Sequence, residues 1–293
     1  MGHDHSFEKN TKRLNLAIFI NVVLTIVQVI GGVFSGSLSL IADALHNLSD
    51  AGALLIALIA RKIGNRVPDN NLTYGYKMAE ILGALINSTT LVIIGLYLCY
   101  EAVSRFNTQE PIDGWIVVIV AGIALVIDIA TAILTYLAGG KGNLNIRAAF
   151  IHNVSDALAS VAVIIAGTLI ILYQFYLVDL ITTICISGYV IYHGVMLLKK
   201  SVYIFMQAVP ENLDLGVVKQ HLTAIKGVKD AEHIHIWQLD DNTIFFEGHI
   251  LVSDKTSGSE IKSVIRSTLA EKFQINHSTI ELNWESRNPS WGR

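Results

Sequence analysis

Long apolar blocks separated by short polar segments dominate the first two thirds of the chain. A helix needs about 20 apolar residues to cross a bilayer, and six stretches reach or approach that length. The expected spans are 14–34, 38–60, 79–103, 115–138, 146–172 and 176–198. The first is too long for the apolar core of a signal peptide, and another span follows it directly. The pattern therefore predicts an α-helical polytopic membrane domain with six transmembrane helices.

The pattern changes after about residue 203, where the chain becomes more polar and shows shorter periods. A small sheet is expected, with an α-β-β-α-β order that is typical of an α+β, ferredoxin-like domain. Its elements are predicted at 211–225 (helix), 228–239 and 243–253 (strands), 258–273 (helix) and 278–284 (strand). The predicted parts are an N-terminal tail (1–13), a membrane domain (14–203), a C-terminal domain (204–285) and a C-terminal tail (286–293).

Composition agrees with a membrane protein. Of 293 residues, 52% are hydrophobic and 15% are charged, less charge than a soluble domain usually carries. The net charge of −3 and the lack of a basic run argue against a nucleic-acid partner. Cys99 and Cys185 lie inside apolar runs and form no C-x-x-C motif, so they are interpreted as small apolar packing residues.

Basic residues predict the orientation, because cytoplasmic loops are enriched in Lys and Arg. The loops on one side of the expected spans hold Arg105 alone. Eleven basic residues lie on the other side: Lys9, Lys12, Arg13, Arg61, Lys62, Arg66, Lys77, Lys141, Arg147, Lys199 and Lys200. This asymmetry places both termini in the cytoplasm.

Ionisable side chains inside spans cost roughly 2.5–3.5 kcal/mol each at a helix centre, so they indicate function. The second span carries His46 and Asp50, and the fifth carries His152 and Asp156. A spacing of four places each pair on one helix face. At about 1.5 Å per residue, Asp50 and Asp156 each lie roughly 15 Å from the cytoplasmic end of their spans. Two imidazoles and two carboxylates at one depth predict a tetrahedral divalent-metal site suited to zinc. A single pair would be explained equally well by hydrogen bonding between helices.

Two further acids lie within spans. Asp43 precedes His46 by three residues and shares its helix face, and Asp128 lies in the fourth span. Both are candidates for an access or proton path, although a hydrogen bond to a neighbouring helix explains Asp128 equally well. Gly32 and Gly36 form a G-x-x-x-G pattern that indicates close helix packing.

Several motifs, taken together and in order, carry a family resemblance. They are SGSLSLIADALHNLSDAGALL, PDNNLTYGYKMAEILGALIN and IRAAFIHNVSDALASVAVIIAG in the membrane domain, and MQAVPEN, HIHIW and HSTIELNWE after it. The chain resembles the cation diffusion facilitator family of metal/proton exchangers over nearly its whole length. Without a His-rich loop between the fourth and fifth spans, it is similar to the prokaryotic members.

The resemblance implies a transport site of His46, Asp50, His152 and Asp156 in a homodimer whose cytoplasmic domains bind metal and mediate dimerisation. It implies Zn²⁺ as the cargo, often with Cd²⁺ or Co²⁺, and the bacterial inner membrane as the location; Fe²⁺ is a further candidate because it can use the same ligands. Some relatives hold another metal in the loop after the second span. Here Asp69 is kept, but Leu72 and Tyr76 stand at the other two positions, so no metal site is predicted in that loop.

The cytoplasmic candidates are less definite. Alternation places His233 and His235 on one strand face, whereas alignment with the family points to Glu232, His249 and Glu281. Glu232 falls on the opposite face from His233 and His235 unless a bulge intervenes. The complete set of candidates is Glu232, His233, His235, His249, His277 and Glu281. A solvated polar sheet face explains any one of them equally well, and His193 and His221 are assigned structural roles.

The predicted function is efflux of a divalent cation, most simply Zn²⁺, coupled to proton uptake by alternating access. Metal ligands must lose protons before they bind, and histidine exchanges protons near neutral pH. An intramembrane metalloprotease would need H-E-x-x-H, which is missing, and no Walker loop supports ATP-driven transport or a nucleotide partner. A metal sensor without transport is the remaining alternative, and no organic cofactor or enzymatic activity is expected.

Overall fold

The computed structural model describes residues 22–108, 110–137, 144–240, 243–253 and 258–284. The chain forms two compact units. The membrane unit comprises residues 1–58 and 86–197, and the second unit comprises residues 59–85 and 198–293. Residues 14–21 of the first expected span lie outside the described residues.

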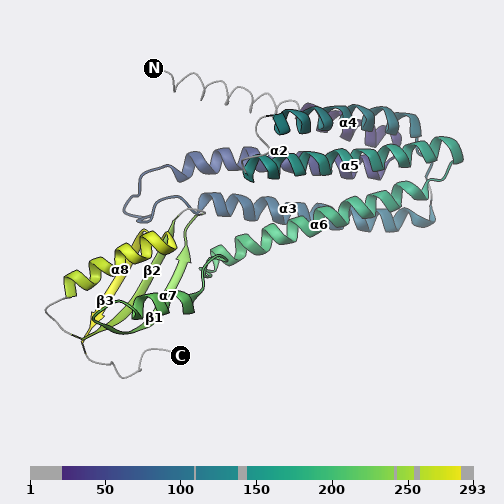
Figure 1. Ribbon diagram of the computed structural model, residues 1–293. Helices are drawn as coiled ribbons and strands as arrows, with labels where there is room; N and C mark the ends of the chain where they lie inside the picture. The colour runs from purple at the N-terminus through teal and green to yellow at the C-terminus, as the bar shows by residue number, and fades with distance from the viewer. Residues whose placement is uncertain (1–21, 109, 138–143, 241–242, 254–257, 285–293) are drawn as a thin grey trace, which may run out of the picture. The chain divides into compact units, whose positions relative to one another are not determined.

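Long helices make up the membrane unit (Figure 1). After an apolar helix at Val22–Ser35, they are α2 (Leu38–Gly64), α3 (Ala79–Ser104), α4 (Gly114–Leu137), α5 (Leu144–Tyr173) and α6 (Leu177–Phe205). Among the described residues, four helices are long and apolar enough to cross a membrane, and they lie in α3 to α6. The helical membrane domain is therefore confirmed, while the number of six spans stays a prediction.

The membrane helices pack through small residues and buried aliphatic side chains. A Cβ added to Gly32 would lie 2.5 Å from Cγ1 of Ile41, so the first helix and α2 approach as closely as the G-x-x-x-G pattern predicts. Gly36 has φ +76°, which favours glycine at the turn between these helices. Leu40, Val117 and Val163 are fully buried in one core cluster that joins α2, α4 and α5.

A buried carboxylate secures the start of α2. Asp179, in the first turn of α6, is fully buried and accepts hydrogen bonds from the hydroxyls of Ser37 and Ser39, each at 2.6 Å. It also accepts from the backbone N–H groups of Leu38 (2.8 Å) and Ser39 (3.3 Å). The first turn of a helix has unpaired N–H donors and a partial positive charge, so an anion stabilises it. Asp179 thereby fixes α2 against α6 at this end of the unit.

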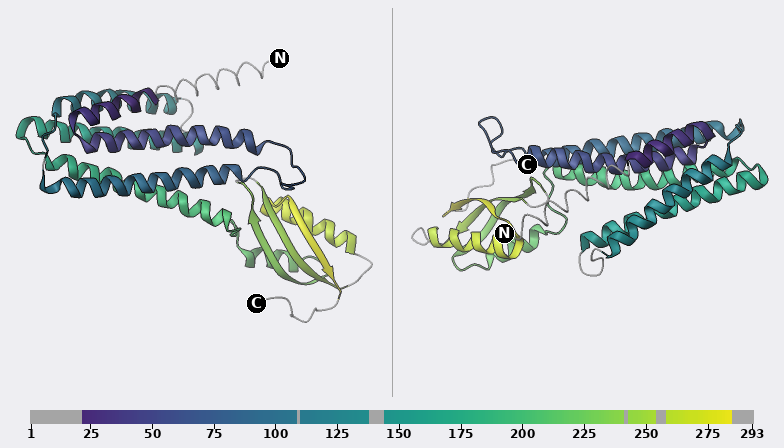
Figure 2. Two further views of the ribbon diagram at one scale, coloured as in Figure 1. Left: turned by 180° about the vertical axis from the view of Figure 1, so that it is seen from behind. Right: turned by 90° about the horizontal axis from the view of Figure 1, so that it is seen from above.

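The C-terminal domain has the predicted order of elements: α7 (Leu215–Thr223), β1 (Val228–Gln238), β2 (Ile244–Val252), α8 (Gly258–Phe273) and β3 (His277–Asn283). The sheet order is β1-β2-β3, with β1 and β2 antiparallel and β2 and β3 parallel. Asp214 caps α7 by accepting from the N–H of Val217. Figure 2 shows the three strands beside the two helices.

One sheet face packs against both helices. Val218 and Leu222 of α7, Ile265 and Leu269 of α8, and Ile250 of β2 are all fully buried in one cluster. Alternation along β2 sends the next side chains to the opposite face, where Glu247 is exposed. Both helices therefore cover the apolar face, and the other face is left for polar residues.

The loop between α2 and α3 contacts the β1–β2 hairpin within the second unit. The Lys77 ammonium donates to the Thr243 hydroxyl at 2.7 Å and lies 3.3 Å from Asp240 Oδ2. The rings of Tyr74 and Phe245 meet edge to face at 5.3 Å. A charged contact and an aromatic contact thus join this loop to the domain.

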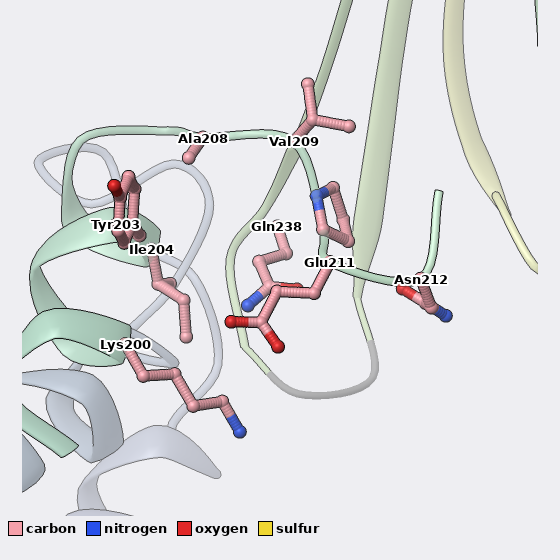
Figure 3. A pocket seen from close by; sticks show the side chains of 9 residues that line it. Lys200, Tyr203, Ile204, Ala208, Val209, Glu211, Asn212 and Gln238 are labelled. Atoms are coloured by element: carbon pink, nitrogen blue, oxygen red, sulfur yellow. The ribbon is translucent and has the colours of Figure 1, made fainter. Parts of the chain in front are cut away.

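A small hollow follows α6 in the same unit. Its volume is about 260 Å³, and Figure 3 shows Lys200 and Tyr203 from α6 with Glu211 and Gln238 around it. Of its lining residues only Glu211 carries a carboxylate, and no histidine or cysteine lines it. Its donor set does not favour a transition metal.

Candidate metal centre

Four side chains from α2 and α5 form a closed ring of imidazoles and carboxylates. His46 Nε2 lies 3.7 Å from Asp50 Oδ2 and 3.2 Å from Asp156 Oδ1. His152 Nε2 lies 3.2 Å from Asp50 Oδ2 and 3.6 Å from Asp156 Oδ2. Each imidazole therefore lies beside its own helix's carboxylate and the carboxylate of the other helix. This arrangement brings together all four residues of the two His-x-x-x-Asp pairs.

The spacing of these atoms suits one small divalent ion. In a tetrahedral zinc site with metal–ligand distances near 2.0–2.1 Å, neighbouring ligand atoms lie about 3.3 Å apart. The four contacts of the ring fall between 3.2 and 3.7 Å. Two imidazoles also make a poor match for Mg²⁺ or Ca²⁺, which prefer oxygen ligands. Spacing and donor type together favour zinc or a similar transition metal.

Burial adds to this picture. His46 and Asp156 are buried, while the His152 side chain is 44% exposed. His46 Nδ1 is a buried atom without a hydrogen-bond partner among the described residues. Within the described part of the chain, the one group of three metal-ligand side chains whose ligand atoms all lie within 4.8 Å of one another is His46, Asp50 and Asp156. His152 extends that group through its contacts with both carboxylates.

A cavity of about 500 Å³ begins at this ring. Its wall includes Asn87 in the first half of α3, Ser155 in the first half of α5, and His193 in the second half of α6. Since α3 and α5 run antiparallel to α6, these halves share one end of the membrane unit. The basic loops predict that this end is cytoplasmic. The opposite end is the one that Asp179 secures.

The two further acids lie in buried hydrogen-bond networks. Asp43 Oδ2 accepts from Gln28 Nε2 at 2.6 Å, and Gln28 Oε1 in turn accepts from Asn47 Nδ2 at 3.0 Å. Asp43 Oδ1 is buried without a hydrogen-bond partner among the described residues. Asp128 accepts from the Ser160 hydroxyl at 2.9 Å. The hydrogen bond expected as the alternative role of Asp128 is therefore present.

A second group of candidates gathers on the open face of the sheet. The register of β1 shifts between Glu232 and His235, so that Glu232 pairs with His249 and His235 pairs with Glu247. Paired residues on neighbouring strands project from the same face. The bulge therefore places Glu232 and His235 on one face, which strict alternation had denied.

His233 lies in the bulge itself and has φ 48°, a left-handed conformation that is uncommon for a residue with a side chain. Its ring lies 4.4 Å from that of His235 and 4.9 Å from that of His249. His249 Nε2 lies 3.6 Å from Glu281 Oε2 on β3. Three imidazoles and a carboxylate thus meet at the surface.

His277 is separate from this group. It starts β3, pairs in register with Phe245, and packs its ring 4.5 Å from the Phe245 ring. At about 3.3 Å per residue, it lies roughly 13 Å along the strand from Glu281. Its first contact is therefore aromatic.

Asp69 in the α2–α3 loop organises the loop itself. It accepts from the N–H groups of Asn71 and Leu72, and from the Tyr76 hydroxyl at 2.5 Å. These donors, Tyr76 foremost, lower the pKa of Asp69 and stabilise its charged form. The lack of a metal site in this loop stays a prediction.

Apolar helices long enough to span a membrane, a ring of two imidazoles and two carboxylates that could hold a metal ion, and a small C-terminal α+β domain are the features of a multi-pass membrane protein that handles metal cations. Residues 14–206 match the family model described as "Cation efflux transmembrane domain", and residues 210–284 match the one described as "Cation efflux protein, cytoplasmic domain". The chain belongs to this family, the cation diffusion facilitators, whose members transport metal cations and are not enzymes.

Curated relatives match over nearly the whole length. A cadmium, cobalt and zinc/H(+)-K(+) antiporter of Bacillus subtilis is 33% identical, with 98% of this chain and 94% of the relative covered. Zinc transporter ZitB of Escherichia coli is 32% identical, covering 97% and 93%. The metal cation efflux system protein CzcD of Cupriavidus metallidurans is 34% identical, covering 96% and 89%. The solved metal-bound C-terminal domain of a CzcD transporter is 30% identical, with a TM-score of 0.23, over 24% of this chain and 99% of that one.

Proposed function

We propose that this protein exports Zn²⁺ from the cytoplasm in exchange for protons, with the ion held by His46, Asp50, His152 and Asp156. The observation that carries the proposal is the closed ring in which each imidazole lies within 3.7 Å of both carboxylates. The names of the relatives, which include zinc, cadmium and cobalt transporters, support a divalent cargo. Cd²⁺, Co²⁺ and Fe²⁺ fit the same donors and remain alternative cargoes.

Charge and protons make the ring suitable for exchange. Two carboxylates balance the charge of one divalent ion, so the loaded site is close to neutral inside the membrane. A protonated imidazole cannot ligate a metal, so metal and protons exclude one another at His46 and His152. Mutually exclusive occupancy at a site that opens to each side in turn is the minimum requirement for antiport.

Asp43 and Asp128 are proposed to belong to the proton path. Asp43 is 1% exposed and has an oxygen without a hydrogen-bond partner among the described residues, an arrangement that suits a neutral, protonated carboxyl. If it carries protons, Asp43→Asn should abolish zinc flux driven by a pH gradient while zinc–zinc exchange continues. Equal loss of both activities would contradict this role and indicate a structural one.

The proposed arrangement in the cell is a homodimer in the bacterial inner membrane, with six spans and both termini cytoplasmic. The cytoplasmic-domain match, whose range follows the membrane domain, supports an intracellular second domain. In this orientation the 500 Å³ cavity leads from the ring toward the cytoplasm, and the Asp179 contacts close the opposite end.

We also propose that the imidazole cluster on the sheet binds metal. Bound metal there would stabilise the strained conformation of His233, because the free energy of metal binding offsets the cost of the positive φ that places its imidazole. His233, His235, His249 and Glu281 are the proposed ligand group, with Glu232 beside it and His277 apart from it.

Zinc flux into inside-out proteoliposomes tests the main proposal. The purified full chain should take up zinc at a rate that increases when the vesicle interior is acidified, and Asp156→Asn should abolish uptake. Asp113→Asn is a matched control, since it neutralises an exposed acid in the same unit that only caps α4. Normal flux in Asp156→Asn would contradict the site, and flux that ignores the pH gradient would contradict the coupling.

A further inference from the structure

The cavity beside the candidate metal centre is lined by a histidine that is not one of the four residues of that centre. His193 lies on α6, is exposed, and lines the same cavity as His46, Asp50 and His152. It is nevertheless within a helix long and apolar enough to cross a membrane. A polar ring in such a helix is expensive against lipid, so its place in the cavity wall indicates contact with water or with cargo.

The aromatic side chain of Tyr189 lies between His193 and His46 of the four-residue centre. The ring of Tyr189 meets that of His46 edge to face at 6.1 Å, and it lies 4.4 Å from the ring of His193. His193 follows Tyr189 by one helical turn, which is about 6 Å along the axis. His193 therefore lies beyond Tyr189 in the direction of the predicted cytoplasmic end.

The packing of the aromatic rings is compatible with either a structural or a metal-binding role for His193. The position of His193 in the cavity wall favours metal binding. A purely structural histidine would be expected to bury its ring among its aromatic neighbours, Tyr189 and Tyr192. Instead His193 is exposed and lines the cavity that also contains His46, Asp50 and His152. Imidazole is also a common ligand of the metals that suit those four residues.

We propose that His193 is a metal-capturing residue of the access cavity. It binds the ion transiently on the way from the cytoplasm to the four-ligand ring. This inference rests on the proposed transport function. The Asn87 amide and the Ser155 hydroxyl line the same wall and offer oxygen donors, while water would complete the shell of the passing ion. A site with a single imidazole is weaker than the ring, so the ion moves on to the stronger ligands.

The first test measures zinc flux into inside-out proteoliposomes over a range of zinc concentrations. In His193→Ala, flux per unit zinc at low concentration should fall about fivefold, while the rate at saturating zinc stays within about twofold of the wild type. His193→Cys supplies another zinc ligand and should restore the low-concentration flux, whereas His193→Asn should not. A role in packing alone predicts no rescue by cysteine. Equal flux in His193→Ala and wild type at every zinc concentration would overturn the inference.

The second test asks whether the position meets the ion. In a background with Cys99→Ala and Cys185→Ala, His193→Cys should react with a charged thiol reagent added from the cytoplasmic side, and Cd²⁺ should block the reaction. Tyr192→Cys is the matched control, because this adjacent residue is exposed but does not line the cavity, so it should stay unreactive. No reaction at position 193, or no protection by Cd²⁺, would contradict capture.

Failure of the proposed function is distinguishable from failure of this inference. If Asp156→Asn keeps normal flux, the four-ligand site itself is wrong. If Asp156→Asn abolishes flux while His193→Ala behaves as wild type, the site stands and only the capturing role of His193 is rejected.

Discussion

The two histidine-containing clusters of this protein use similar side chains in different surroundings, one between membrane helices and the other on the open face of a small sheet. In the helical ring, the side chains of His46 and Asp156 are each 10% exposed, those of Asp50 and His152 are 28% and 44% exposed, and two membrane helices hold all four. On the sheet, His249 and Glu281 are 27% and 46% exposed, and the neighbouring His233 depends on a strained bulge.

The apolar helices around the ring change what a proton or a metal ion contributes there. Carboxylates inside a membrane need compensating charge, so the ring is stable only with protons or metal present, and one can replace the other. At the sheet surface water solvates the charged carboxylates, so they are stable without a bound ion. Binding of metal there therefore does not require an exchange for protons. We therefore expect the ring to move ions and the surface cluster to sense or retain them.

Removing one imidazole from each cluster should separate their roles most strongly. His152→Ala should lower zinc flux about a hundredfold, because loss of a direct ligand costs at least as much as loss of a residue that merely orients one. His249→Ala should lower flux about tenfold or less, since it acts only through coupling between the domains. Flux in proteoliposomes measures both variants, and equal losses would refute the division of roles.

Metal binding in the absence of the ring should report the surface cluster alone. In the full chain carrying Asp50→Asn and Asp156→Asn, zinc should still bind, and adding His249→Ala should weaken that binding about tenfold. Equilibrium dialysis with metal analysis measures the affinity, and His221→Ala serves as a control for a half-buried imidazole outside the cluster. Unchanged binding after His249→Ala would remove the surface cluster from consideration.

Two glycine substitutions on β1 should change stability in opposite directions. Without metal, His233→Gly should stabilise the protein by about 1 kcal/mol, because glycine adopts a positive φ without strain. His235→Gly, whose φ is not positive, should destabilise it by a similar amount. Zinc should raise the melting temperature of wild type more than that of His233→Gly. Destabilisation by both substitutions would show that His233 is not strained.

The smallest effect is expected at a surface ion pair of the same domain. Lys219 lies 3.0 Å from Asp230 and lowers the pKa of that carboxyl below its usual value of 3.8. A lowered pKa in the folded state means that the pair stabilises the fold fully above about pH 4 and loses this contribution as pH falls further. Asp230→Asn should cost less than about 1 kcal/mol at pH 7 and flatten the acid dependence. If the stability of Asp230→Asn falls with decreasing pH as steeply as that of the wild type, the ion pair does not contribute to acid sensitivity as predicted.

Much of the architecture was predictable because periodicity and hydropathy act locally. Predicted and observed bounds of β1 differ by one residue, and those of α8 agree. The two His-x-x-x-Asp pairs were predictable because charged residues are rare within apolar helices. The sequence assigns His193 a structural role, since one histidine on a helix gives no pattern, and only the cavity in the structure suggests the capturing role that we propose.

Composition and helical spacing are local properties, so they predict a helical membrane protein, the position of its apolar helices and the four side chains of the two His-x-x-x-Asp pairs, whereas the family follows from the resemblance of its motifs. The packing of the helices is needed to show that each imidazole reaches both carboxylates, and the strand register is needed to show that a bulge at His233 places Glu232 and His235 on one sheet face. The tertiary structure also decided that the cavity includes His193. These features depend on the packing of segments that are distant in sequence, and local patterns carry no information about such contacts.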